Sequence, residues 1–167
     1  MGTKIALAVL IALAVAAAAT ASPPKHANVM LRSTSVGTVL VDGRGRTLYL
    51  FTADPTAKSA CYGQCAAVWP PFLTSDAPVK VGAAKQALLK TVKRKDGTLQ
   101  VVYAGHPLYF FSGDTRAGQT KGEGIVHFGG SWYALNAAGK ALKPASSPAP
   151  APNPPGDGGG YGGGYGP

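Results

Sequence analysis

Apolar and β-branched residues come in short runs between residues 29 and 143, and glycine-containing turns separate these runs. Residues 38–41 and 46–51 are two such runs, and the turn sequence 42–45 (DGRG) between them predicts an antiparallel hairpin. Along the second run, leucines on one strand face alternate with Tyr49 and Phe51 on the other. Because both faces are apolar, we expect this strand to lie centrally in a sheet.

The second half of the chain shows the same alternation of runs and turns. Residues 90–95 and 98–103 flank Asp96-Gly97, a dipeptide typical of a two-residue type I′ hairpin. A further turn at 104–106 leads into a strand at 107–112.

Weaker patterns predict the remaining elements. We expect a first strand at 29–31, a closing strand at 131–135 and a last short strand near 141–143. Residues 59–68 and 83–89 each fit one short helical segment. The interval 115–124 is polar and glycine-rich, and we expect an exposed loop there.

The two halves share the motif Tyr-x-aromatic-x-x-Asp, and the second copy lies sixty residues after the first. The motif residues are Tyr49, Phe51, Asp54, Tyr109, Phe111 and Asp114. An internal duplication explains the common register. Trp69 and Trp132 hold roughly corresponding positions in the two copies, so we expect both indoles to pack in the core.

These patterns together predict a mainly β fold, a small antiparallel meander built from two tandem strand-turn repeats with one or two short helices. The duplicated domain is expected at 29–143, with repeat 1 at about 37–73 and repeat 2 at about 97–135. Asp54 precedes a proline, which cannot donate to a strand ladder, so we expect the motif aspartate to close a turn. The alternative is an aspartate that binds a cation or acts as a base.

The two ends of the chain differ from its middle. Residues 1–21 join one cation, Lys4, to an apolar run that ends in small residues, as in a cleaved secretory signal peptide. A retained anchor is the alternative, although the run is shorter than the roughly 20 residues that span a bilayer. Residues 22–28 should form a flexible start, and the Pro/Gly/Tyr-rich residues 144–167 a disordered tail. Tyr161 and Tyr165 could give this tail weak affinity for a polymer or another chain.

The chain is basic. Its 167 residues include 16 Lys and Arg against 7 Asp and Glu, for a formal net charge of +9, and the signal segment supplies one of these cations. Such an exported chain is attracted to anionic envelope polymers or lipid head groups, and another envelope protein is a further candidate partner. The densest run, 90–95, alternates in a way that favours a solvated strand over a polyanion site. We expect no specific nucleic-acid partner and no membrane span after cleavage.

The motifs resemble a bacterial family of secreted proteins and lipoproteins whose hallmark is the Tyr-x-aromatic-x-x-Asp repeat. The resemblance covers roughly residues 36–135. It is carried by residues 48–54, Cys61-x-x-x-Cys65-Ala66, Trp69-Pro70-Pro71, Arg94-x-Asp96-Gly97, Gly105-His106-Pro107-Leu108-Tyr109 and Gly130-x-Trp132-Tyr133. It implies a small extracytoplasmic repeat domain of unknown function. This chain lacks the lipid-bearing cysteine of lipidated members.

Cys61 and Cys65 are the two cysteines of the chain, and in an exported protein a disulfide is the first expectation. Residues four apart on a regular helix have Cβ atoms about 5 to 6 Å apart, too far for a bridge. Gly63 between them would allow the segment to leave regular helix. So short a loop would add about 2 kcal/mol by the loop-closure formula, enough to fix a local turn.

The alternative is a copper site in an extracytoplasmic metal-binding or electron-transfer accessory protein. Cys61 and Cys65 would bind the metal with His106 or His127, because thiolates and imidazoles are suitable copper ligands. The spacing matches no complete metal or redox signature, and turn placement explains both histidines.

No catalytic signature is present: the sequence has no Gly-x-Ser-x-Gly elbow and no evident carboxylate pair for glycoside chemistry. We therefore expect a secreted, periplasmic or envelope-associated protein that is soluble after cleavage and needs no cofactor. Its expected function is that of a non-catalytic binding or structural module of the cell envelope.

Overall fold

The computed structural model describes residues 26–143. The predicted signal peptide and tail lie outside these residues. Short strands dominate the described part, as predicted, and they are β1 (Asn28–Thr34), β2 (Gly37–Asp42), β3 (Tyr49–Phe51), β4 (Leu73–Thr74), β5 (Val79–Lys80), β6 (Leu89–Lys93), β7 (Leu99–Tyr103), β8 (His106–Pro107), β9 (Val126–His127) and β10 (Gly130–Ala134). The helical segments are α1 (Gln64–Val68) and a 3-10 turn at Gln86–Leu88.

The strands form three small sheets with the orders β2-β1-β5, β3-β10-β9 and β4-β7-β6, and β8 adds to β7. All pairings are antiparallel except the short contact of β1 with β5. The mainly β, antiparallel prediction is therefore confirmed. The domain begins earlier than expected, since Ala27 is buried and its carbonyl accepts from the Val79 amide.

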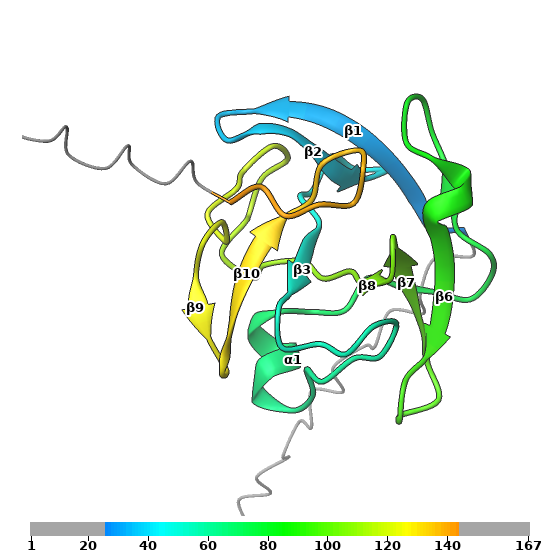
Figure 1. Ribbon diagram of the computed structural model, residues 1–167, viewed down its shortest axis with the longest axis vertical. Coiled ribbons are helices and arrows are strands. Elements are labelled where there is room, and N and C mark those ends of the chain that lie inside the picture. The colour runs from blue at the N-terminus through cyan, green and yellow to red at the C-terminus, as the bar shows by residue number, and fades with distance from the viewer. Residues whose placement is uncertain (1–25, 144–167) are drawn as a thin grey trace, which may run out of the picture.

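Strand β3 lies near the middle of the molecule, between β10 and the segment that follows β8 (Figure 1). Every residue of β3 is buried, which agrees with the two apolar faces of its sequence. Its hairpin with β2 is short: the Leu48 amide donates to the Leu40 carbonyl at 3.0 Å, and the chain beyond pairs elsewhere. The central position of this strand brings the first motif copy into contact with the second.

The turn at Asp96-Gly97 differs from the prediction. Gly97 has a φ of +84°, whereas Asp96 is not among the residues with positive φ, so a type I′ turn is wrong here. The Arg94 amide donates to the Thr98 carbonyl, leaving a three-residue loop with glycine at the bulge. The type I′ geometry occurs instead at Ala104-Gly105, which joins β7 to β8 with φ values of +51° and +86°.

The second motif strand is shorter than predicted, because its partner contains prolines. The Phe110 amide donates to the Pro70 carbonyl at 2.8 Å, but Pro70 has no amide hydrogen to return the bond. Pro71 likewise cannot donate, and Tyr109 makes only isolated bridges. Residues 108–111 therefore form no continuous strand, and Ser112 already lies in a turn.

Two hydrophobic clusters form the core. One cluster contains the motif tyrosines, both tryptophans and both cysteines, and the other lies under the β1, β6 and β7 strands. No helix in the part of the chain that the structure describes is long and apolar enough to cross a membrane.

Candidate functional site

The two motif tyrosines meet at the centre of the domain. The Tyr49 amide donates to the Tyr109 carbonyl at 2.9 Å, and the Tyr109 amide returns the bond to Tyr49 at 3.0 Å. Both residues are fully buried. This reciprocal bridge joins the backbones of the two motif copies directly.

The tyrosine hydroxyls cross between the repeats. The Tyr49 hydroxyl donates to Asp114 Oδ2 at 2.6 Å, and the Tyr109 hydroxyl donates to Asp54 Oδ2 at 2.7 Å. Each motif tyrosine is thus bound by the aspartate of the other repeat. We call these contacts the crossed Tyr-Asp pairs.

Each aspartate also closes a loop within its own repeat. Asp54 Oδ1 accepts the Ala60 amide at 2.7 Å, and Asp114 Oδ1 accepts the Lys121 amide at 2.9 Å. The two oxygens of each carboxylate therefore have different partners, one in its own loop and one in the other repeat. The aspartates lie in separate sites and do not share a pocket.

Four aromatic rings form an aromatic stack of Phe51, Trp132, Trp69 and Phe111, and the two motif tyrosines pack edge-on against its tryptophans. The indoles of Trp69 and Trp132 are parallel within 3°, with ring centroids 4.0 Å apart. Phe51 packs on Trp132 at 4.1 Å, and Phe111 packs on Trp69 at 4.5 Å. Each motif phenylalanine therefore contacts the tryptophan of the opposite repeat. The aromatic contacts run between the repeats in the same way as the tyrosine hydroxyl bonds.

The glycine-rich loop 115–124 packs over this stack and is only partly exposed. A Cβ on Gly122 would stand 2.9 Å from both Trp69 Cη2 and Tyr49 Cζ, so only glycine fits without displacement. The Glu123 carboxylate accepts the Ala134 amide at 2.7 Å, which fastens the loop to β10. The expectation of an exposed connection is wrong for this end of the loop.

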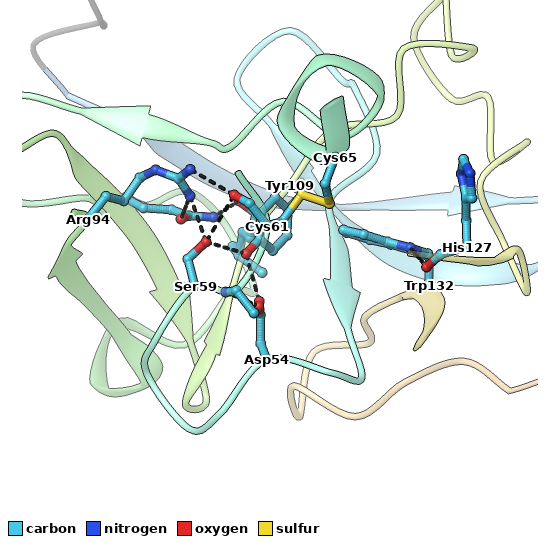
Figure 2. The surroundings of a disulfide bond; sticks show 11 residues. Asp54, Ser59, Cys61, Cys65, Arg94, Tyr109, His127 and Trp132 are labelled. Carbon is cyan, nitrogen blue, oxygen red and sulfur yellow. Dashed lines mark hydrogen bonds between the residues drawn. A yellow bond between two sulfur atoms is a disulfide. The ribbon is translucent and has the colours of Figure 1, made fainter. Parts of the chain in front are cut away.

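Arg94 is buried, contrary to the sequence prediction. It was expected on a solvated strand, yet it is only 5% exposed. Its Nη1 donates to Ser59 Oγ at 2.7 Å and to Gln100 Oε1 at 2.6 Å, and its Nη2 donates to the Cys61 carbonyl at 2.9 Å. Figure 2 shows the resulting chain of hydrogen bonds from Arg94 through Ser59 and Tyr109 to Asp54.

Burial controls the protonation of the crossed pairs. Desolvation, followed by the hydrogen bond to Asp114, raises the pKa of Tyr49 far above its usual value. Desolvation and the charge of Asp54 raise the pKa of Tyr109 in the same direction. Desolvation also raises the pKa of Asp54 and of Asp114, although hydrogen bonds from the tyrosines and loop amides oppose it. Both tyrosines are therefore protonated donors at neutral pH.

The sulfur atoms of Cys61 and Cys65 are joined in a disulfide whose Cα atoms are 5.3 Å apart. Gly63 has a φ of +55° and lies immediately before α1, so the first cysteine lies outside regular helix. Both cysteines belong to the same buried cluster as Tyr109 and Trp132, whose rings pack edge to face with centroids 5.2 Å apart (Figure 2).

The structure does not bring the histidines to the cysteines. His127 lies on the far side of Trp132 from the disulfide (Figure 2), and its carbonyl accepts the Trp132 indole hydrogen at 3.2 Å. His106 begins β8, and burial lowers its pKa. Across residues 26–143 there is no group of three or more His, Cys, Asp or Glu side chains that could hold a metal ion.

A family model described as a secreted repeat of unknown function matches residues 30–72 and 90–136. The chain belongs to this family. Each range matched by the secreted-repeat model contains one motif copy and one tryptophan of the stack. Each also covers most of a hairpin, β1-β2 in the first and β6-β7 in the second. No curated protein and no solved structure matches the chain.

In this secreted repeat, the motif side chains contact one another. The tyrosine hydroxyls, carboxylates and aromatic faces all find partners inside the domain, and the crossed bonds are the part that sequence reasoning missed. The two Asp-to-loop bonds are local and follow from turn chemistry. The arrangement holds two repeats together and presents a surface built from the loops and hairpins around them.

Proposed function

We propose that this secreted repeat is a non-catalytic binding module that holds an anionic polymer of the cell envelope on its basic surface. The crossed Tyr-Asp pairs and the aromatic stack form its scaffold. Binding takes place on the exposed cations, which have few acidic neighbours.

The observation that carries this proposal is the separation of the two charge signs. Among the described residues, the exposed acidic side chains are Asp76 and Asp96 alone. The other acids are buried or half-buried, and each accepts a hydrogen bond within the fold. The described cations are exposed except for Arg46 and Arg94. Because only two of the described acids are exposed, the surface around the cations has few negative side chains that would repel an anionic polymer.

The proposal also explains why the motif need not touch a ligand. The motif aspartates form hydrogen bonds within the domain and are half-buried. Fully exposed aspartates would repel an anionic polymer more strongly. The cations on β6 (Lys90 and Lys93) and in the 115–124 loop are held on elements that the scaffold fixes. A polymer with regularly spaced charges gains from several such contacts at once.

Titration calorimetry tests the proposal directly. The purified chain without residues 1–21 is titrated with polyphosphate, with poly-γ-glutamate and with neutral dextran at several salt concentrations. We expect binding to at least one polyanion, a linear fall of log K with log salt, and no binding to dextran. Absence of binding to both polyanions at low salt would overturn the proposal.

A further inference from the structure

We propose that four arginines around the turn between β2 and β3 form a binding site for the phosphate groups of an anionic polymer. The arginine cluster consists of Arg32, Arg44, Arg46 and Arg116. This inference rests on the proposed function, because it names the ligand chemistry and the residues of one part of the basic surface.

Two glycines bring the arginines together. The Gly118 amide donates to the Gly45 carbonyl at 2.9 Å, which joins the loop 115–124 to the turn between β2 and β3. Arg44 and Arg46 flank Gly45 in sequence, and Arg116 lies two residues before Gly118. The contact between the glycines therefore gathers arginines from segments more than seventy residues apart.

Arg32 reaches the same place from β1. A Cβ on Gly45 would collide with Arg32 Nη1, and a Cβ on Gly118 would lie 3.6 Å from Arg32 Nε. The guanidinium thus lies directly over the backbone of both glycines. Gly45 has a φ of +79°, so the turn geometry also favours glycine there.

The cluster keeps an excess of positive charge. Asp42 is its local acid, is buried, and binds Arg46 through Nη2 at 2.8 Å and Nε at 2.9 Å. The other oxygen of Asp42 accepts the amides of Arg44 and Arg46. Within residues 26–143, no carboxylate lies within ion-pair distance of Arg32, Arg44 or Arg116. Three guanidinium groups are therefore left to bind an external anion.

A hollow accompanies these charges. It has a volume of about 340 Å³, and Arg32, Arg44 and Gly45 line it together with the apolar side chains of Met30 and Val41. The hollow is open to solvent at one side of the β1-β2 hairpin. It offers charged walls for an anionic group and apolar surface for the carbon atoms of the polymer beside it.

The choice of arginine indicates phosphate. Every arginine of the chain except the buried Arg94 belongs to this cluster, whereas the exposed cations elsewhere are lysines. A guanidinium fork binds two oxygens at once, while an ammonium group acts as a point charge. A phosphate group presents oxygens in several directions, so several guanidinium forks can bind it at once more easily than they can bind a carboxylate, whose two oxygens lie in one plane. The cluster therefore fits phosphate better than carboxylate.

The test replaces guanidinium groups by ammonium groups, which keeps the positive charge but removes the bidentate hydrogen bonding. The triple variant Arg32→Lys, Arg44→Lys, Arg116→Lys is compared with the wild type and with a matched triple variant, Lys90→Gln, Lys93→Gln, Lys95→Gln, on β6 and its turn. Binding of polyphosphate and of poly-γ-glutamate of equal charge is measured by calorimetry at one salt concentration. Thermal unfolding of each variant reports whether the fold is retained.

We expect the wild type to prefer polyphosphate, and the arginine-to-lysine variant to bind polyphosphate about tenfold more weakly. The β6 variant should weaken both polymers to a similar, smaller extent. Unchanged polyphosphate affinity in the arginine-to-lysine variant would overturn the site while leaving the proposed function standing. A wild type that binds neither polymer would overturn both.

A second measurement covers the case in which the arginine-to-lysine variant fails to fold. Amide chemical shifts of the wild type are followed while inorganic phosphate is added. Shifts concentrated at Gly45, Gly118 and their neighbours support the site. Shifts concentrated on β6, or spread evenly over the lysines, overturn it.

Discussion

The hydroxyl group of each motif tyrosine is held in an apolar core by a carboxylate from the other repeat. A buried hydroxyl without a partner would destabilise the fold, and a hydrogen bond to a charged acceptor contributes about 1.5 to 3 kcal/mol. The aspartate in turn is kept partly solvated at its loop and accepts a backbone amide there. Each carboxylate thus accepts a hydrogen bond from a backbone amide of its own loop and another from a tyrosine hydroxyl of the other repeat.

Alkaline pH should destabilise the domain through these tyrosines. Tyrosines of the unfolded chain ionise near pH 10, while burial raises the pKa of Tyr49 and Tyr109 well above that. Between these values the folded state holds more protons than the unfolded state, so its stability falls as pH rises. Each tyrosine contributes a slope of about 1.4 kcal/mol per pH unit.

Urea denaturation between about pH 10.5 and pH 11.5 measures this slope, because the tyrosines of the unfolded chain are then largely ionised. In Tyr49→Phe one of the two tyrosine contributions is removed, so the alkaline slope should become shallower by about 1.4 kcal/mol per pH unit. A slope that Tyr49→Phe leaves unchanged would show that Tyr49 is not a protonated, buried donor.

Local sequence chemistry predicted that each motif aspartate closes a turn. It could not predict the hydrogen bond from the tyrosine of the other repeat. An aspartate before Pro55 closes a turn because its oxygen reaches amides a few residues away. The bond from Tyr49 to Asp114 spans 65 residues, and no local pattern selects that partner over Asp54. Arg94 shows the same limit, because its burial depends on Ser59 and Cys61 from the other repeat.

Among the elements, the alternation of apolar and polar residues predicted where strands occur. It did not predict their lengths as well. Apolar alternation indicated β3 and β10, since both lie against the core. The length of the strand after β8 depends on whether its neighbour can donate, and Pro70 and Pro71 cannot. The turn at Asp96-Gly97 suits either of two hairpin types, and the Asp96 side chain bonds to Thr98 in the one that forms.

The disulfide loop before α1 gives a direct prediction. In chain purified without reductant from its secretory compartment, Cys61 and Cys65 should give no titratable thiol even in denaturant, and elemental analysis should find no stoichiometric copper. Burial of both sulfurs beside Trp132 protects the bridge from reductant. Two titratable thiols with one copper per chain would favour the metal-binding alternative.

The whole molecule is an interlocked pair of repeats. The hydroxyl bonds, the phenylalanine-to-tryptophan contacts and the Tyr49-Tyr109 bridge all run from one repeat to the other. Because each repeat completes the polar and aromatic contacts of its partner, we infer that neither has a complete core alone. The interlocking also explains how a small domain can keep most of its described acids buried or half-buried while most of its described cations stay exposed.

The most direct test of this interlocking is a double-mutant cycle on stability. Tyr49→Phe, Asp114→Asn and the double variant are compared by urea denaturation, and the same cycle is measured for Tyr49 and Asp54 of one repeat. We predict a coupling energy of about 1.5 to 3 kcal/mol for Tyr49 with Asp114, and less than about 0.5 kcal/mol for Tyr49 with Asp54. Strong coupling within the repeat and none across it would contradict the account.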